Sequence, residues 1–281
     1  MPTAQKGVDV DGPTWTWEYF LVPQYGDTPA SSAFGLFSPV HLGVIVLLTV
    51  GLVLLVVRYR AADDVARRRI RMTVATSVLL LEVLRQLAYV AVGAYTPEIL
   101  PLHICGVSAF IVMVDATVTN RWTGDFLYVL GWWGALAAVL FPEWAHRPIL
   151  NIYTWQSFAV HALIFGYALM LLVGGDLVPK VANLVRVAAV ITALATVAAL
   201  ANWVWGTNFW FLNVGSPGSP LEPIQAITGG AYIPVLIVLF ALLTAVLYWP
   251  WHVNATRARA ALTVLPPQPE PEPEPLAPVG G

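Results

Sequence analysis

Seven long apolar stretches alternate with short polar connectors along the chain. A hydrocarbon layer of roughly 30 Å needs about twenty helical residues at about 1.5 Å per residue. Such stretches lie near residues 38–57, 72–95, 101–119, 125–141, 151–173, 184–205 and 230–250. The pattern therefore predicts an all-α polytopic membrane protein, a bundle of seven transmembrane helices. The fourth stretch is short and ends at Pro142, so a re-entrant segment is the alternative there.

The cations predict which side of the membrane each connector faces. The connector after the first stretch carries six arginines, from Arg58 to Arg71, and the positive-inside rule places it in the cytoplasm. With seven spans, eleven cations fall on that side, Lys6 and Arg147 fall on the other, and Arg85 lies within a span. We therefore expect the N-terminus outside and the C-terminus inside, in a multi-pass protein of the bacterial cell (plasma) membrane.

Two terminal segments differ in composition from the span-rich middle, residues 38–250. Residues 1–37 lack a charged start followed by a short apolar run and a cleavage site, so we expect a retained extracytoplasmic leader. Residues 251–281 become rich in Pro and Glu, a composition that cannot bury apolar surface. This end is predicted to be a disordered cytoplasmic tail.

Composition narrows the classes of partner. Hydrophobic residues make up 58% of the chain and charged residues only 11%, against about a quarter in soluble domains. The net charge of −2 and the few cations exclude a nucleic-acid-binding surface, which leaves membrane lipids as the expected partners and no protein partner identified. The histidines of the spans lack paired metal-ligand spacing, and the last span has no lysine for a retinal Schiff base. We expect no metal and no cofactor.

Ionisable residues inside spans are costly unless paired, so each one is a candidate for function. In the second span Glu82, Arg85, Gln86 and Tyr89 follow i, i+3, i+4, i+7 spacing and share one helix face. One interpretation is an ion pair between Glu82 and Arg85 that stabilises packing. The other is a wider polar surface that faces the bundle interior.

The third span supplies the single cysteine of the chain, which excludes an intramolecular disulfide. Pro101 is suited to a first helical turn, with His103 and Cys105 just after it. Ser108 and Asp115 are seven residues apart and share a face, from which Cys105 is displaced by about 60–80°. Cys105 is either a small buried apolar residue or a reactive thiol.

The fifth span carries a polar stripe that includes Ser157 and His161, and helical rise places His161 about 15 Å below the outer end. His161 is either a neutral imidazole bonded to a neighbouring helix, or a general base or headgroup ligand. His41 opens the first span and Asn202 closes the sixth, both on the predicted outer side. Together, the polar residues of these spans predict an outward-facing cavity.

Several separated motifs resemble the YwaF family of bacterial integral membrane proteins, which also includes the eukaryotic transmembrane protein 164. They are FGLFSPVH at 34–41, LPLHICG at 100–106, NIYTWQSFAVH at 151–161, and GTNFWFL at 206–212 with SPLE at 219–222. The resemblance covers nearly all of residues 34–250. It implies a multi-helix membrane fold and, for the eukaryotic member, acyl transfer onto lysophospholipids by a cysteine and a histidine within the membrane.

The resemblance implies that His161 stands at the position of the family's histidine. The eukaryotic Pro-Cys-His pattern reads Pro101-Leu102-His103 here, so Leu102 occupies the cysteine position and Cys105 is displaced from it along the third span. An acyl-transfer enzyme is then expected to use Cys105, or alternatively Ser108, as nucleophile and His161 or His103 as base. The alternatives are a non-catalytic lipid or small-molecule binder or transporter that uses Arg85 and Glu82, and an assembly subunit of a membrane complex.

Overall fold

The computed structural model describes residues 17–23, 26–118 and 121–264, and in these residues the chain is all-helical without strands. The α-helices are α1 (Pro39–Ala61), α2 (Asp64–Ala91), α3 (Ile104–Val118), α4 (Arg121–Leu130), α5 (Leu136–Leu140), α6 (Ile152–Gly174), α7 (Leu184–Trp205), α8 (Leu221–Thr228) and α9 (Tyr232–Val264). Short 3-10 turns are η1 (Ala30–Ser32), η2 (Pro97–Ile99), η4 (Glu143–His146), η5 (Val181–Asn183), η6 (Phe209–Phe211) and η7 (Gly229–Ala231), and η3 (Gly131–Ala135) is a π-helix.

The predicted bundle of seven membrane-crossing helices is confirmed for the described part of the chain, where seven segments have the length and apolar character of a span. The fourth segment covers Thr123–His146, because α4, the π-helix η3, α5 and η4 follow one another closely. The last covers Leu221–Asn254, which begins before the predicted start at residue 230 because α8 precedes α9.

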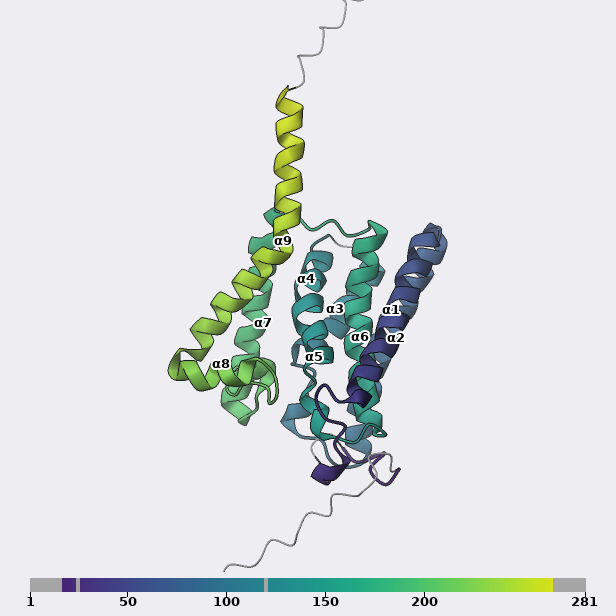
Figure 1. Cartoon of the computed structure of the whole chain (residues 1–281), viewed down its shortest axis with the longest axis vertical. Helices are drawn as coiled ribbons and strands as arrows, with labels where there is room; N and C mark the ends of the chain where they lie inside the picture. Colours follow the sequence, from purple (N-terminus) through teal and green to yellow (C-terminus); the bar gives the residue numbers. More distant parts are fainter. Residues whose placement is uncertain (1–16, 24–25, 119–120, 265–281) are drawn as a thin grey trace, which may run out of the picture.

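The bundle has two chemically different ends. At one, which we call the arginine-rich end, α1 finishes and α2 begins with Arg58, Arg60 and the run Arg67–Arg71 nearby. At the other, the leader end, residues 17–23 and 26–38 approach the starts of α1 and α6 (Figure 1). The positive-inside rule still predicts that the arginine-rich end faces the cytoplasm. The tail was predicted to begin at residue 251, but helix α9 continues to Val264; residues 265–281 and 1–16 lie outside the described residues.

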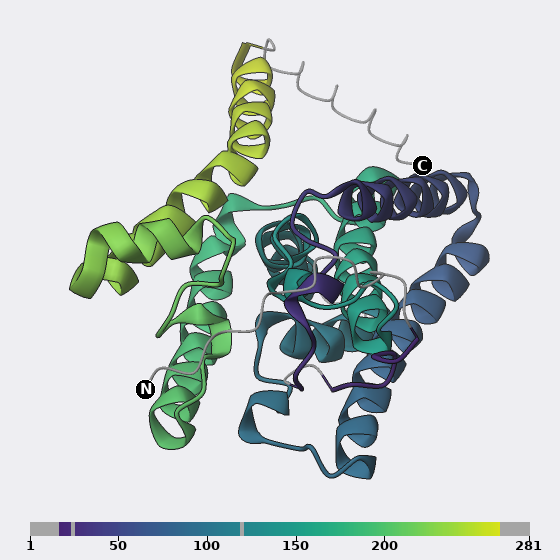
Figure 2. The same ribbon diagram turned by 60° about the horizontal axis from the view of Figure 1, so that its bottom comes forward.

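Helix α6 lies at the centre of the bundle, with α1 and α2 to one side and α4 and α5 beside it (Figures 1 and 2). In the most apolar part of this span 67% of the residues are buried within the protein, against 11% in the span of α1. Helix α6 therefore packs in the core, and α1 faces outward. Small residues allow the close contact with α1: a Cβ on Gly166 would come within 2.6 Å of Leu52. Close backbone approach of this kind is how helices associate in lipid.

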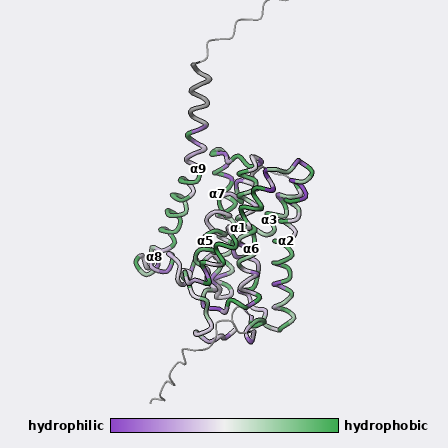
Figure 3. Tube along the Cα trace, turned by 45° about the vertical axis from the view of Figure 1, so that its right-hand side comes forward, coloured by the Kyte–Doolittle hydropathy of each residue, from purple (hydrophilic) through white to green (hydrophobic). Residues whose placement is uncertain are grey.

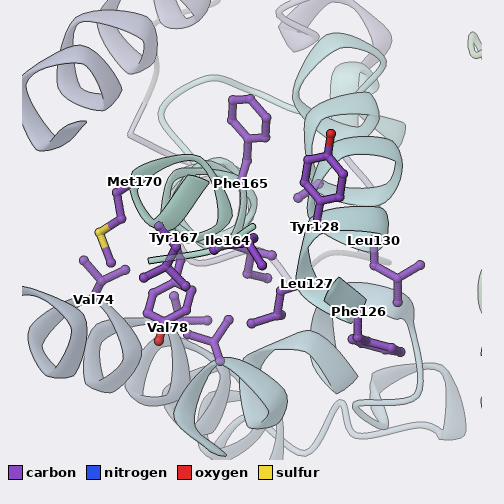
Figure 4. Packing of buried hydrophobic residues seen from close by; sticks show 14 of the residues in the cluster. Val74, Val78, Phe126, Leu127, Tyr128, Leu130, Ile164, Phe165, Tyr167 and Met170 are labelled. Carbon is purple, nitrogen blue, oxygen red and sulfur yellow. The ribbon is translucent and has the colours of Figure 1, made fainter. Parts of the chain in front are cut away.

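The main apolar core joins α2, α4 and α6. Figure 4 shows Val74 and Val78 from α2 and Leu127 from α4 gathered with Ile164, Tyr167 and Met170 from α6. Leu127, Tyr167 and Met170 are completely buried. This core also includes Ala109 and Val112 of α3, so it fixes the positions of α2, α3, α4 and α6 relative to one another.

Helices α7, α8 and α9 flank this core on the side away from α1 and α2 (Figures 1 and 2). Helix α9 is held at its first residue and at its middle, where the Tyr232 hydroxyl donates to the Phe211 carbonyl oxygen and the Tyr248 hydroxyl donates to Asp125. Between these points Ile237, Leu242 and Val246 are exposed, and Figure 3 shows this stretch of α9 as hydrophobic. Exposed apolar side chains on a membrane-crossing helix are suited to contact with lipid tails.

The described part of the leader is bound to the bundle through the connector between η4 and α6. Asn151 caps α6 by accepting from the Tyr153 and Thr154 amides, and its Nδ2 donates to the carbonyl oxygens of Tyr19 and Val22. Arg147 is completely buried and donates to the Val22 and Pro23 carbonyl oxygens. Burial lowers the pKa of the Arg147 guanidinium.

Candidate functional site

A polar network on α2 connects this helix to the turn that precedes α3. The Arg85 guanidinium donates to both carboxylate oxygens of Glu82, at 2.8 and 3.2 Å. Gln86 donates to Glu82 at 2.7 Å, and both Arg85 and Gln86 donate to the Ile99 carbonyl oxygen. Glu82 and Ile99 are buried. The predicted ion pair is therefore present, and it also fixes the chain segment that leads to His103.

Close backbone packing shapes the turn from Leu100 to Gly106. A Cβ on Gly106 would lie 2.8 Å from the backbone of Pro101, so only glycine fits there without a backbone shift. The Leu102 carbonyl oxygen accepts from Trp210 Nε1 at 2.8 Å, and the His103 carbonyl oxygen accepts from the Val107 amide as α3 begins. These contacts hold His103 and Cys105 at the leader end of α3.

His103 packs against the connector between α7 and α8. Its ring contacts Phe209 edge-on, with centroids 5.1 Å apart, and lies 5.7 Å from Phe211. Trp210 and Phe211 adopt left-handed backbone conformations, with φ of 59° and 54°, which are costly for aromatic residues. Within the described residues the His103 ring makes no hydrogen bond. Only the GTNFWFL motif pointed to this connector, and the sequence gave no sign of its contact with His103.

His161 is held in one orientation by its own helix and by a tryptophan. Its Nδ1 lies 2.7 Å from the Ser157 carbonyl oxygen, and its ring stacks on Trp144 with centroids 5.2 Å apart. Because a carbonyl oxygen only accepts, Nδ1 carries the hydrogen, and in the neutral ring Nε2 keeps a lone pair. Trp144 comes from η4, a segment that the spacing of polar residues did not connect with His161.

Arg85 of α2 lies within electrostatic range of four other ionisable groups, which come from α2, α6 and the start of α3. His103 interacts with Arg85 and His161, and His161 also interacts with Glu82 and Arg85. The Cys105 thiol interacts with Glu82 and Arg85. We call Glu82, Arg85, His103, Cys105 and His161 the leader-end site. Its members are largely enclosed by protein, which strengthens electrostatic interactions among them.

Three further predicted residues surround this site. The Tyr89 ring packs against Tyr153, with centroids 4.9 Å apart. Ser157 contributes its carbonyl oxygen to His161. The Ser108 hydroxyl is 1% exposed and has no hydrogen-bond partner within the described residues.

Asp115 belongs to a different cluster, toward the arginine-rich end. It accepts from Arg71 at 3.1 Å, from the Tyr167 hydroxyl at 2.8 Å and from the Thr123 hydroxyl at 2.6 Å. Ser108 and Asp115 share a helix face, but seven residues separate them by about 10 Å along the helix axis. The two side chains therefore lie at different depths of the bundle. Asp115 connects α2, α3, α4 and α6.

His41 and Asn202 have local structural roles. His41 Nδ1 accepts from the Phe37 amide at 3.0 Å, so Nε2 carries the hydrogen and donates to the Val139 carbonyl oxygen at 3.0 Å. Asn202 accepts from the Phe209 amide and the Thr207 hydroxyl and donates to the Phe209 carbonyl oxygen, which folds the connector after α7. Both ring nitrogens of His41 thus form hydrogen bonds, whereas in His161 only Nδ1 does.

Two buried charged residues were not predicted to be buried from the sequence. Asp125 is 1% exposed and accepts from the Tyr248 hydroxyl, the Lys180 amide and Asn183. Arg147 was assigned to an outer connector and is completely buried. In the sequence, the position of Asp125 at the start of an apolar stretch could have indicated a buried carboxylate. In the described ranges, no group of three His, Cys, Asp or Glu side chains is placed to hold a metal ion.

Comparisons with known proteins give one match. The model of the TMEM164 family matches residues 36–251, which spans α1 to the middle of α9 and every member of the leader-end site. No curated protein and no solved structure matches the chain. The expected similarity to transmembrane protein 164 is confirmed, whereas the match carries no YwaF name.

Proposed function

Because the chain belongs to the TMEM164 family of multi-pass membrane proteins, we propose that it transfers acyl groups between phospholipids at the leader-end site. The observation that carries the proposal is the state of His161. Its Nδ1 is occupied by the Ser157 carbonyl oxygen, its ring is fixed against Trp144, and Nε2 is left as a proton acceptor. A fixed neutral imidazole is what a general base requires. The proposed location is the cell membrane, with membrane lipids as partners.

The proposed reaction uses the Cys105 thiol as nucleophile. His161 Nε2 takes the thiol proton, sulfur forms a bond to the acyl carbonyl carbon of a phospholipid, and the ester C–O bond breaks. The departing oxygen takes the proton from His161 and leaves as a lysophospholipid hydroxyl. The hydroxyl of an acceptor lysophospholipid then attacks the thioester, its proton passes through His161 to sulfur, and the thiol is restored.

Arg85 supports lipid binding in this proposal. Its Nε and Nη2 are used by Glu82 and the Ile99 carbonyl oxygen, whereas Nη1 has no acceptor among the described residues. The unused N–H groups are suited to a phosphate oxygen, since guanidinium groups bind phosphate through charge-assisted hydrogen bonds. The pair with Glu82 holds the guanidinium in place without filling all its donors.

The nucleophile of this chain stands at a different position from the family's cysteine. Leu102, which occupies that position, packs into an apolar cluster with Ala198, Ala201 and Phe209. Cys105 lies one turn further along, near Glu82 and Arg85. A positive charge nearby favours a thiolate, whereas the carboxylate opposes it.

A second candidate function is non-catalytic binding of a phospholipid at the same site. The observation that favours it is the absence of a hydrogen bond between the Cys105 thiol and either imidazole within the described residues. Here Arg85 would hold the phosphate, and the histidines would contact the headgroup without proton transfer.

The test measures acyl exchange between labelled phosphatidylethanolamine and lysophosphatidylethanolamine by purified full-length protein in vesicles. Removal of the base in His161→Gln should lower the rate by at least about 100-fold, in line with general-base contributions. Cys105→Ala should abolish both the rate and the labelled acyl-protein intermediate. The matched control is His146→Gln, an exposed histidine at the same end of the bundle, which should keep the wild-type rate.

The outcomes separate the two functions. Full exchange by both Cys105→Ala and His161→Gln would contradict the proposed reaction. Absence of exchange by wild type, combined with co-purified phospholipid that is lost in Arg85→Gln, would instead establish the non-catalytic function.

A further inference from the structure

A polar pocket of about 420 Å³ opens at the arginine-rich end, on the opposite side of the bundle from the leader-end site. It lies between the start of α2, the end of α3 and the end of α6. The lining residues are Tyr59, Asp64, Arg67, Arg68, Arg71, Ala116, Thr117 and Asp176. Nothing in the proposed acyl transfer uses this pocket.

Arg67 forms a rigid wall of the pocket. Its guanidinium donates to the carbonyl oxygens of Ala62, Arg60 and Gly174 and to Asp176 at 3.4 Å. These bonds close the end of α1 and the end of α6. The donors of the Arg67 guanidinium are therefore used in hydrogen bonds within the protein. Arg67 shapes the pocket but is not a donor for a ligand.

Arg71 and Arg68 retain unused donors. Arg71 donates through Nη2 to the Asp115 carbonyl and carboxylate oxygens and through Nε to the Tyr167 hydroxyl, whereas its Nη1 has no acceptor within the described ranges. Arg68 is exposed, and its guanidinium has no acceptor among the residues that the structure describes. Two guanidinium groups one turn apart on α2 thus line the same pocket with vacant N–H groups.

The carboxylates in and beside the pocket leave the charge of Arg68 without an acidic partner among the described residues. Asp176 accepts from the Tyr59 hydroxyl at 2.6 Å and from Arg67, so its charge is compensated within the protein. Asp64 lies in the first turn of α2, where the helix dipole already favours a carboxylate. Asp115 pairs in the same way with Arg71, so Arg68 is the lining arginine without a carboxylate partner among the described residues, and its vacant N–H groups favour an anion.

An apolar track leads from the pocket along the outside of α3. Phe110, Val114 and Val118 follow i, i+4, i+8 spacing and are 46%, 47% and 67% exposed. Thr117 and Ala116, which line the pocket, lie on the same last turn as Val118. A ligand that places a phosphate in the pocket can therefore extend acyl chains along a surface that faces hydrocarbon.

We propose that this pocket binds the phosphate of a membrane phospholipid from the leaflet at the arginine-rich end, with Arg68 and the Nη1 of Arg71 as its donors. Guanidinium forks match phosphate oxygens in geometry and charge. The lipid acts here as a bound ligand that connects α2, α3 and α6, independently of any reaction at the leader-end site.

The test titrates delipidated full-length protein with phosphatidylglycerol and counts bound lipids by native mass spectrometry. Arg68→Gln removes one charge-assisted contact, so the affinity for the first lipid should fall about tenfold. The matched control is Arg69→Gln, which removes the same charge from the neighbouring position of α2 without touching the pocket, and it should stay within about twofold of wild type. Unchanged unfolding temperatures verify that both variants are folded.

Each other outcome overturns the proposal. Equal losses in Arg68→Gln and Arg69→Gln would show a general attraction between a basic end and an anionic lipid. Saturable binding of inorganic phosphate that Arg68→Gln abolishes, without binding of phosphatidylglycerol, would assign the pocket to free phosphate.

Discussion

At the scale of single residues, hydrogen bonds distinguish histidines that the sequence left equivalent. His41 uses both ring nitrogens, His161 uses one, and His103 uses none within the described residues. Helical spacing predicts the depth and the face of a side chain, but not the partner that a neighbouring helix presents. Because these partners are backbone groups of Phe37, Val139 and Ser157, no pattern of side chains could have shown them.

Loss of the His41 ring should destabilise the protein without a direct effect on the leader-end site. In His41→Ala the buried Val139 carbonyl oxygen and the Phe37 amide lose their partner, which costs about 1–3 kcal/mol of the free energy of unfolding. The measurement is the thermal unfolding midpoint in detergent. His146→Ala, at an exposed histidine, should change the midpoint little. Equal midpoints for the two variants would contradict the structural role of His41.

At the scale of elements, the length of the apolar stretches predicted the seven crossings. The residues at which the helices begin and end became clear only from the structure. Arg71 was placed in a connector because the second apolar stretch starts at residue 72, yet α2 begins at Asp64. The charge of Arg71 is compensated by Asp115 of α3, a pairing that lowers the cost of an arginine within a span. The length of an apolar stretch cannot reveal a compensating charge on another helix. Asp115 was therefore grouped with the residues of the leader end, although it pairs toward the arginine-rich end.

The leader is a separate element whose attachment can be tested through Asn151. Asn151→Asp keeps an oxygen for the Tyr153 and Thr154 amides, but it loses the two N–H donors to Tyr19 and Val22. Loss of these bonds, about 1–3 kcal/mol together, should raise proteinase K cleavage within residues 17–37 roughly tenfold or more. The α6 cap should survive, so the unfolding midpoint should fall further in Asn151→Ala. Equal cleavage of wild type and Asn151→Asp would show that Arg147 and packing alone hold the leader.

At the scale of the whole molecule, buried and pocket-lining polar groups gather at two ends of one bundle. The leader-end site joins α2, α3 and α6 near η2 and η4, and the polar pocket joins the same three helices at the arginine-rich end. The buried core between them, which includes Val78, Leu127 and Ile164, separates the two polar regions. Of the residues expected to line one outward-facing cavity, Asp115 pairs toward one end of the bundle and Glu82 toward the other.

The orientation of this bundle in the membrane follows from its cations and is directly testable. Alternating crossings place the connector after α1 and the segment before α7 at one end, together with Arg58, Lys180 and Arg186, so the positive-inside rule predicts that this end is cytoplasmic. In a Cys105→Ser background, Pro217→Cys at the leader end should react with a membrane-impermeant maleimide in intact cells. Ala61→Cys, at the arginine-rich end, should react only after permeabilisation. The reverse labelling pattern would invert the topology and would place the phosphate pocket in the outer leaflet, since pocket and arginines lie at the same end of α2.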